Sequence, residues 1–595
     1  MAIAWQTITD QYDIPVNFGD VDAWGDDVAS SMRAQMTEVG VEADQLYYRT
    51  RGGDVLGPFQ LPAAPGGTDA GVAAYVADGS STPAALAGWD ARRTTTRNVL
   101  DYGARGDGLA DDTAAIQAAL DAGGDVYLPA GIYLVSDELR VGSYTTLRGC
   151  GIDVSVIVAA DSMPRRLNVV TNAKNTRSAR PDSDVDTTLR VADLTILGSY
   201  DSRPTGGEWS GNASGVYLAG VADTVIERVK VVRAPLHGFA VDASFLPTPE
   251  QESPTFYASC PSRDVVIRDC IAIDSAVDDG FTTHYSHDIV IERCVATLAN
   301  VNTASGGVQN GFEVDDGSWR VTVRDCVARG WQNGFQVKGH TTCPPAYDIT
   351  IDACKAIGCA CGFACAASHW SARNVTIRSC EVIGPADVGT DGNRGCSMKL
   401  YGYEDVFVRD FTIRDAPYGG IIMYTNGVIV LDGITAYSTF TTTTPPEGSS
   451  DGLIRVTGQA TSNANIVIRD VRASTPIGAG HLIRVNAATD MLVTITNVVG
   501  AGPAANAAVS LPFYNAGHRV DRIQVSGFGG LVEFRGGSGA TAGITGAPQV
   551  LTGTGDPNGR FFAPPGSMFL RTDGAAGTTL YVKTTPASSA SWTAK

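Results

Sequence analysis

The chain has 595 residues, of which 44% are hydrophobic and 18% are charged, so it can bury a large core over more than one domain. Its net charge of -19 argues against a nucleic-acid partner, because such binding depends on Lys and Arg neutralising phosphates. No window approaches about 18 continuous apolar residues, and the N-terminus lacks a basic and then apolar segment. We therefore expect no membrane partner and no secretion signal.

The N-terminal region divides into two predicted segments. Residues 20–48 contain a pattern that predicts one amphipathic helix within an attachment segment, 1–50. Residues 51–92 form a predicted linker that contains a Gly-Pro-x-x-Leu-Pro element, starting at Gly57, and a following Ala-rich stretch. This element resembles a short motif of bacteriophage tail fibres. The resemblance implies that the N-terminus joins other phage tail or baseplate proteins.

The next segment, 97–151, carries several motifs in a fixed order. It contains Asp-Tyr-Gly-Ala-x-Gly-Asp-Gly, an Asp-Asp-Thr helix start, a Val-Tyr-Leu-Pro-Ala-Gly strand and a Leu-Arg-Gly turn. Asp111 or Asp112 can cap a helix whose Ile116, Ala119 and Leu120 form one apolar stripe. The segment resembles the N-terminal signature of the pectate-lyase superfamily. That resemblance implies an all-β, right-handed parallel β-helix, capped by this helix, which we place at 93–535.

A hexapeptide ending in cysteine repeats at intervals of 24 to 32 residues, a spacing that indicates a solenoid. Within each copy apolar and polar residues alternate, as in a half-buried strand. The five thiols should therefore form one interior column of reduced, packed side chains. The cluster GCACGFAC (358–365) lacks a second ligand pair, so we interpret it in the same way. The cysteines of the column are Cys270, Cys294, Cys326, Cys354 and Cys380.

A second repeat begins with glycine and supplies another strand to each coil. Examples are GFAVDAS (238), GFTTHYS (280), GFEVDDGS (311), GFQVKGH (334) and GCSMKLY (395). The residue before the glycine is often Asn, Asp or His, types that favour a tight corner. The Phe and the residue two positions later should face the core, and the intervening residues should face solvent. One outward column then contains Glu313, and the next contains Asp242, His284, Asp315, Lys338, Lys399 and Tyr424.

Asp315 is predicted to lie about one strand spacing from both His284 and Lys338. Two interpretations of this column remain open. It is either an exposed ladder of alternating charges that contributes little stability, or a groove that binds a polymer. Asp316 falls at the end of the strand and is expected to shape the turn.

The paired residues Asp278 and Asp279 precede a strand, and Lys338 follows two coils later. This arrangement is similar to polygalacturonase-type glycoside hydrolases, with two departures, since His237 and Asn310 stand where that family has an aspartate and a histidine. The resemblance implies hydrolysis with one carboxyl as acid and another as base. Glu313 and Asp315 are substitute candidates for the missing partners, His284 is a further catalytic candidate, and Lys338 would bind sugar.

β-Elimination is the alternative reaction. It requires a base that removes the proton α to a uronate carboxyl, and a cation that stabilises the enolate. Lys338, Lys399, His284 or His340 are candidate bases, and Asp242 or Asp315 could hold Ca²⁺. No spacing forms a recognisable calcium motif, and hydrolysis would need no cofactor or metal.

Flat aromatic rings near the groove are candidate sugar platforms, although isolated surface aromatics more often pack against loops. The candidates are Tyr285, Trp319, Trp331, Trp370, Tyr401 and Tyr424.

A Gly-rich linker, 536–556, precedes a C-terminal module, 557–595, whose Ser-x-Phe-Leu-Arg-Thr-Asp-Gly and Leu-Tyr-Val-Lys strands resemble a module of phage tail proteins. These resemblances imply a homotrimeric tail fibre or tailspike of the virion, assembled in the cytoplasm of a bacterial host. Its partner at the host surface would be a polysaccharide, which it binds and cleaves. A non-catalytic receptor-binding fibre and a free-standing pectin-degrading enzyme remain as alternatives.

Overall fold

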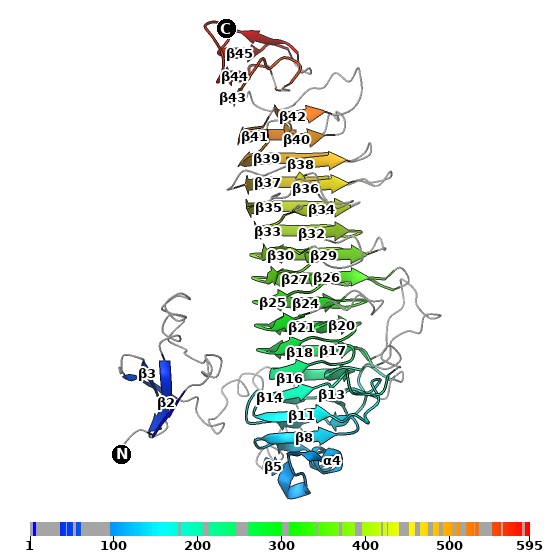
Figure 1. Ribbon diagram of the computed structural model, residues 1–595. Coiled ribbons are helices and arrows are strands. Elements are labelled where there is room, and N and C mark those ends of the chain that lie inside the picture. Colours follow the sequence, from blue (N-terminus) through cyan, green and yellow to red (C-terminus); the bar gives the residue numbers. More distant parts are fainter. Residues whose placement is uncertain are drawn as a thin grey trace, which may run out of the picture. The chain divides into compact units, whose positions relative to one another are not determined.

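A computed structural model of the chain divides into two compact units, Met1–Gly88 and Trp89–Lys595 (Figure 1). The structure describes residues 4–7, 36–42, 45–50, 55–60, 96–175, 180–205, 213–244, 260–299, 309–340, 343–367, 372–386, 395–417, 420–424, 427–438, 452–457, 465–473, 480–486, 492–503, 507–511, 519–528, 530–534, 550–560, 563, 565–585 and 590–595. Among these residues, no helix is long and apolar enough to cross a membrane.

The first unit contains a four-stranded antiparallel sheet. Its strands are β1 (Ala4–Thr7), β2 (Met36–Glu42), β3 (Gln45–Thr50) and β4 (Val55–Gln60), in that order. The helix predicted for 20–48 is therefore wrong over β2 and β3, where MTEVGVE and QLYYRT alternate as strands do. The rest of that prediction, and the Ala-rich stretch after β4, lie outside the described residues.

The second unit contains a parallel β-helix, which confirms the predicted fold class. One wall is a 14-stranded sheet, here called the site wall. Its strands are β9 (Leu139–Val141), β12 (Val170–Asn172), β15 (Val216–Ala219), β17 (Phe239–Asp242), β20 (Phe281–His284), β23 (Asn310–Val314), β26 (Asn333–Gly339), β29 (Cys361–Ala367), β32 (Cys396–Tyr401), β34 (Ile421–Tyr424), β36 (Gly452–Thr457), β38 (His481–Asn486), β40 (Ala507–Leu511) and β42 (Gly530–Phe534).

The rest of the β-helix is a 24-stranded parallel sheet that contributes up to two further strands to each coil. They are β5 (Thr96–Asn98), β6 (Asp107–Asp111), β7 (Gly124–Tyr127), β8 (Gly131–Val135), β10 (Thr145–Arg148), β11 (Ser155–Ala159), β13 (Asp186–Thr187), β14 (Arg190–Leu197), β16 (Val221–Val232), β18 (Arg263–Arg268), β19 (Ile271–Ile273), β21 (His287–Glu292), β22 (Val295–Thr297), β24 (Trp319–Arg324), β25 (Val327–Arg329), β27 (Tyr347–Asp352), β28 (Lys355–Ile357), β30 (Arg373–Arg378), β31 (Glu381–Ile383), β33 (Glu404–Arg414), β35 (Val428–Tyr437), β37 (Asn465–Ala473), β39 (Leu492–Ala501) and β41 (Arg519–Ser526).

Identical residues on successive coils stack into ladders inside the β-helix. Phe239, Phe281, Phe312, Phe335 and Phe363 lie with ring centroids 4.7 to 4.9 Å apart. The predicted column of five cysteines is fully buried, and all twelve cysteines of the chain are free thiols. These two ladders fix the register of the coils.

The corners of the coils lie elsewhere than predicted. Left-handed backbone occurs at the residue that precedes each cysteine of the column, with φ of 54° at Asp269, 51° at Arg293 and 55° at Asp325. Asp tolerates this conformation better than most residues. The residues before the repeated glycines, such as Asp279 and Asn310, have no positive φ and instead line the site wall.

A helix and a small sheet lie toward the two ends of the second unit's sequence. Helix α4 (Thr113–Ala122) follows the 3-10 turn η2 (Val99–Tyr102) and buries Ile116, Ala119 and Leu120, as predicted. The N-cap residue is Asp112, whose carboxylate makes no capping hydrogen bond and accepts instead from Arg105 N and Gly106 N, while Asp111 accepts from Thr113 N at 3.0 Å. Near the C-terminus, β43 (Val550–Gly553), β44 (Met568–Arg571), β45 (Leu580–Lys583) and β46 (Trp592–Ala594) form a separate sheet.

Candidate functional site

A buried network of ionisable side chains crosses four neighbouring strands of the site wall. Asp242 and His284 are paired across β17 and β20, and the His284 Nδ1 atom lies 2.8 Å from Asp242 Oδ1. The other ring nitrogen, Nε2, is 3.4 Å from Asp315 Oδ2. The Lys338 ammonium contacts Asp315 Oδ2 at 3.0 Å and Glu313 Oε1 at 2.8 Å. The predicted proximity of Asp315 to His284 and Lys338 is confirmed.

The same residues are less exposed than predicted. The carboxylates of Asp242, Glu313 and Asp315 are buried, whereas the Lys338 side chain is 22% exposed and that of His284 is 18% exposed. Burial follows from the stacking of coils, because each long side chain covers the carboxylates of its neighbour. The interpretation as an exposed ladder of charges is therefore wrong. Burying this many ionisable groups costs free energy, so surface ion pairing does not explain why they are present.

Contacts between the side chains of this network determine their protonation states. Burial alone would lower the pKa of His284, but Asp242 and Asp315 hold it well above its usual value. Burial would raise the pKa of Asp315, but Lys338 and His284 hold it well below its usual value. Asp315 and Glu313 likewise hold the pKa of Lys338 high against the effect of burial. At neutral pH the network therefore contains ionised Asp315 between two cations.

Asp278 and Asp279 form the second half of the site. Asp279 is fully buried, and its Oδ1 atom accepts from the backbone N (2.9 Å) and Nδ2 (2.8 Å) of Asn310. Asn310 Nδ2 also lies 2.7 Å from Glu313 Oε1, so this amide joins the two halves. Asp278 is only half-buried. Burial and the neighbouring Glu313 raise the pKa of Asp278 to about 7.

His237 faces Asp279 from the preceding coil. Its Nδ1 atom is 3.7 Å from Asp279 Oδ2, and neither atom has a hydrogen-bond partner among the described residues. Burial holds the pKa of His237 well below its usual value, so the ring is neutral. The two departures from the polygalacturonase pattern, His237 and Asn310, are thus both brought against Asp279. The sequence alone indicated their positions but not these contacts.

Asp316 makes a cross-coil contact in addition to ending its strand. Its carboxylate accepts from the His340 backbone N at 2.8 Å and lies 2.6 Å from His340 Nδ1. This hydrogen bond and the nearby Asp315 raise the pKa of His340 to about 9. The imidazole is 58% exposed, so it presents a cation at the edge of the network.

Several predicted binding residues lie apart from the network or are inaccessible. Tyr285 and Trp331 are buried and cannot stack on a sugar. Trp319 belongs to β24 of the other sheet, where its ring stacks on His287 at 4.2 Å. Trp370 lies outside the described residues. Tyr424 is half-buried and pairs with Tyr401 in the column of Lys338, as predicted for Tyr424.

Lys399 lies in the other column, because the predicted register slips by two residues at β32. Lys399 pairs with Ala364, and Tyr401 pairs with Ala366. Met398 takes the core position that phenylalanine holds in earlier coils, and it pairs with Phe363. Gly395 is therefore not the equivalent of the earlier glycines, and Lys399 aligns with Glu313 rather than Asp315.

Three groups of side chains have donor atoms that lie within 4.8 Å of one another and could hold a metal ion. They are Asp316, His340 and Cys343; His237, Asp278 and Asp279; and His284, Glu313 and Asp315. In the third group, the carboxylate of Asp315 already contacts His284 and Lys338. Asp242, one of the two residues that the elimination alternative offers as a calcium ligand, contacts His284 instead.

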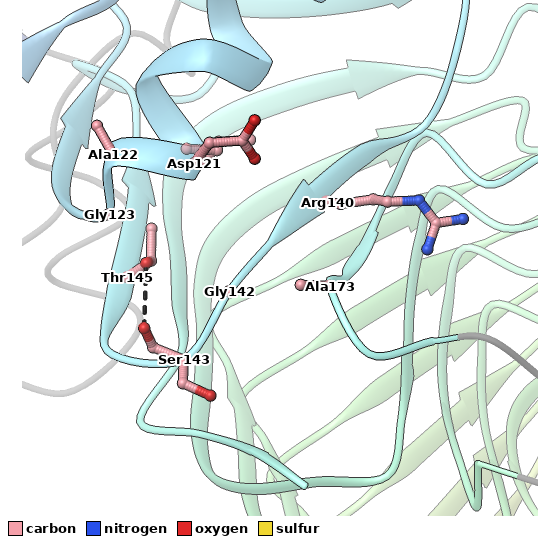
Figure 2. Close-up of a pocket in the computed structure, with 9 residues that line it drawn as sticks. Asp121, Ala122, Gly123, Arg140, Gly142, Ser143, Thr145 and Ala173 are labelled. Atoms are coloured by element: carbon pink, nitrogen blue, oxygen red, sulfur yellow. Dashed lines mark hydrogen bonds between the residues drawn. The ribbon is translucent and has the colours of Figure 1, made fainter. Parts of the chain in front are cut away.

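A hollow of about 270 Å³ lies at the N-terminal end of the β-helix, beside α4 (Figure 2). Small residues form most of its lining, together with Asp121 and Arg140. The Arg140 guanidinium donates to Glu138 and to the carbonyl oxygen of Asn175. The hollow therefore presents no set of paired carboxyls comparable to the site wall.

Part of the chain is similar to proteins with pectate-lyase-like coils. A family model described as "Rhamnogalacturonase A/epimerase, pectate lyase-like" matches residues 96–200. The N-terminal fragment of the bacteriophage phi29 gene product 12 superposes with a TM-score of 0.64 at 23% identity, over 77% of this chain and 74% of that one. This likeness confirms the fold.

Sequence comparison indicates the particular relatives. The chain is 32% identical to the pre-neck appendage protein of Bacillus phage B103 over 265 residues, which is 44% of this chain and 29% of the relative. It is 34% identical to the mannuronan C5-epimerase AlgE4 of Azotobacter vinelandii over 216 residues, 33% of this chain and 34% of that one. The matches thus span about a third or less of each relative. The predicted resemblance to phage tail proteins with a pectate-lyase-like β-helix is confirmed.

Proposed function

We propose that the protein is a phage tail appendage that binds a bacterial surface polysaccharide and cleaves it by glycoside hydrolysis. The similarity to a pre-neck appendage protein supports a place in the virion tail. Twelve free thiols fit assembly in the reducing cytoplasm of a host. In this proposal the N-terminal unit attaches to other tail proteins, and three copies form the mature fibre.

One observation favours hydrolysis. Asp278 and Asp315 lie on neighbouring coils of one connected network, and their environments move the two pKa values in opposite directions. Such a division typically separates the acid from the base of a catalytic pair. Asp278 is half-accessible and partly protonated near neutral pH, so it donates a proton to the glycosidic oxygen. Asp315 remains ionised and accepts a proton from water.

Lys338 and His284 control access to Asp315. Both side chains are partly exposed and lie against the buried carboxylate. In the proposed complex, the Lys338 ammonium turns toward a polar or acidic sugar and exposes Asp315 to water. Asp242 positions His284 through the Nδ1 contact, while His340 contributes a second accessible cation. Hydrolysis at this site needs no cofactor.

Proton abstraction at a uronate carbon is a second candidate. It is favoured by the C5-epimerase relatives, which match up to 43% of the chain. However, the cationic side chains predicted as bases are poorly suited to this task, because Asp242 and Asp315 hold His284 protonated and His340 has a pKa of about 9. Calcium would be expected only for this candidate. A fibre that binds without catalysis is the third possibility.

Product analysis separates these candidates. Cell-wall polysaccharide of Bacillus subtilis and mannuronan are incubated with the full chain, with and without EDTA. New reducing ends without absorbance from unsaturated uronates support hydrolysis, and both signals together indicate elimination. Retained binding with neither signal, and with unchanged uronate stereochemistry by proton NMR, leaves a binding fibre, whereas inverted C5 centres indicate proton abstraction without cleavage. The matched control is Asp325→Asn, which alters an exposed corner carboxylate and keeps a residue suited to left-handed backbone.

A further inference from the structure

A carboxylate, an imidazole and a thiol converge where two neighbouring coils leave the site wall. Asp316 lies in the turn that follows β23, and His340 directly follows β26. Cys343 lies three residues further along, in the loop that leads to β27. The three side chains each offer a ligand atom, and these atoms all lie within 4.8 Å of one another. We call these three residues the corner cluster.

Backbone hydrogen bonds hold the two loops of the corner cluster together. Cys343 N donates to the His340 carbonyl oxygen at 3.3 Å, so these two residues belong to one tight turn. Gly317 N donates across the coils to the Pro344 carbonyl oxygen at 2.6 Å. The carboxylate of Asp316 accepts from His340 N at 2.8 Å. The backbone therefore places the three side chains, in addition to their contacts with one another.

The corner cluster is buried on one side and open on the other. Cys343 is 2% exposed and the Asp316 side chain is 8% exposed, whereas the imidazole of His340 is 58% exposed. Among the described residues, Asp316 forms an ion pair with His340 alone. An ion can thus reach the buried carboxylate and thiol past the exposed ring, and it would not have to displace a Lys or Arg from Asp316.

The other two groups of potential metal ligands differ in their chemistry. In one of them, Asp315 already contacts the Lys338 ammonium at 3.0 Å. The other contains Asp278, the proposed acid, and has no sulfur ligand. Within the part of the chain that the structure describes, the corner cluster is the group that combines a carboxylate, an imidazole and a thiol.

These ligand types indicate which ion would bind. Thiolate and imidazole favour Zn²⁺ and similar transition ions, whereas Ca²⁺ and Mg²⁺ prefer oxygen ligands. Two ligands separated by two residues in one loop, as His340 and Cys343 are, also recur in zinc sites. Three protein ligands leave the fourth position of a tetrahedral zinc ion to water or to an oxygen atom of a bound molecule.

We propose that the corner cluster binds one Zn²⁺ ion, which ties the turn after β23 to the loop after β26. His340 Nδ1 and Asp316 Oδ2 lie 2.6 Å apart. A tetrahedral zinc ion would hold them roughly 3.4 Å apart, a change that rotation of the exposed ring supplies. As the ion binds, the Cys343 thiol and the imidazolium each lose a proton to solvent, so the ion's two charges replace those of two protons. The inference goes beyond the proposed hydrolysis, which needs no metal, and each can fail alone.

Titration of the full chain with Co²⁺ tests the corner cluster. Co²⁺ binds at zinc sites, and a thiolate ligand gives it a charge-transfer band in the near ultraviolet. Wild-type protein, kept reduced and first dialysed against EDTA and then buffer, should gain this band with one ion per chain, and added Zn²⁺ should remove it. Cys343→Ser should lose the band. His340→Gln should weaken Co²⁺ binding at least about tenfold.

The matched control is Cys150→Ser, because Cys150 is the exposed one of the twelve cysteines and lies outside the corner cluster. This variant should keep the band and the affinity of the wild type. Circular dichroism checks the fold of every variant, and if Cys343→Ser does not fold, then the exposed His340 provides the decisive variant. A wild type without the band, a band that persists in Cys343→Ser, a band lost in Cys150→Ser, or an unchanged affinity in His340→Gln would overturn the proposal.

Discussion

The arrangement of carboxyls in the site wall depends on single residues that act across coils. Asn310 donates to both Asp279 and Glu313, so it links the aspartate pair with the contacts of Lys338. The sequence showed which residue types recur on each coil, and it predicted the proximity of Asp315, His284 and Lys338. Burial was missed, because alternation tells which way a side chain points but not what covers it.

Activity should depend on pH through Asp278. As a general acid it must be protonated, so turnover should fall by about tenfold per pH unit above its pKa of about 7. The measurement is kcat/KM for reducing-end release as a function of pH. Asp278→Asn and Asp315→Asn should each lower turnover at least about tenfold, while Asp325→Asn should match the wild type. A wild-type profile that stays level far above neutral pH would exclude Asp278 as the acid.

Lys338 should matter for stability as well as for substrate. Lys338→Met removes the cation that contacts the buried Glu313 and leaves Asp315 with His284 alone, which should cost about 3–5 kcal/mol of unfolding free energy. Lys355→Met removes an exposed ion pair with Glu381 and should cost less than about 1 kcal/mol. Urea unfolding at neutral pH measures both. Equal losses in the two variants would contradict the buried network.

At the scale of elements, stacked ladders hold each coil in register. Phe312 lies between Phe281 and Phe335, with centroids 4.8 and 4.9 Å away. The regular glycine and phenylalanine repeat made this part of the fold predictable as far as Phe363. At β32, Met398 stands where earlier coils have phenylalanine. Gly395 lies outside this strand, and aligning it with the earlier glycines shifted the predicted position of Lys399 by two residues.

Phe312→Ala should lower the unfolding free energy by about 3–5 kcal/mol, because a large cavity opens inside the ladder. Phe312→Leu retains most of the volume and should lose clearly less. Denaturant titration of both variants provides the measurement, with site-wall hydrogen exchange as a second readout. If Phe312→Ala is as stable as Phe312→Leu, then the ladder does not contribute the packing that its geometry indicates.

For the whole molecule, the resemblance of 97–151 predicted the β-helix well, because that segment carries many motifs in order. The segment 20–48 was predicted to contain one helix, but residues 36–42 and 45–48 of it belong to strands, whose short alternating pattern was given too little weight.

The central claim is that the site wall hydrolyses a polysaccharide, and the most direct test follows the atoms of water into the products. The full chain is incubated with Bacillus subtilis cell-wall polysaccharide in heavy-oxygen water, and the shortened chains are analysed by mass spectrometry. Hydrolysis predicts that each new reducing end, reduced with borohydride as it forms so that its oxygen cannot exchange with solvent, carries one heavy oxygen atom, whereas the other new end keeps its original oxygen. Asp278→Asn should form at least about tenfold fewer of these labelled ends. Shortened chains without the label would contradict hydrolysis, as would bound polysaccharide that keeps its full length.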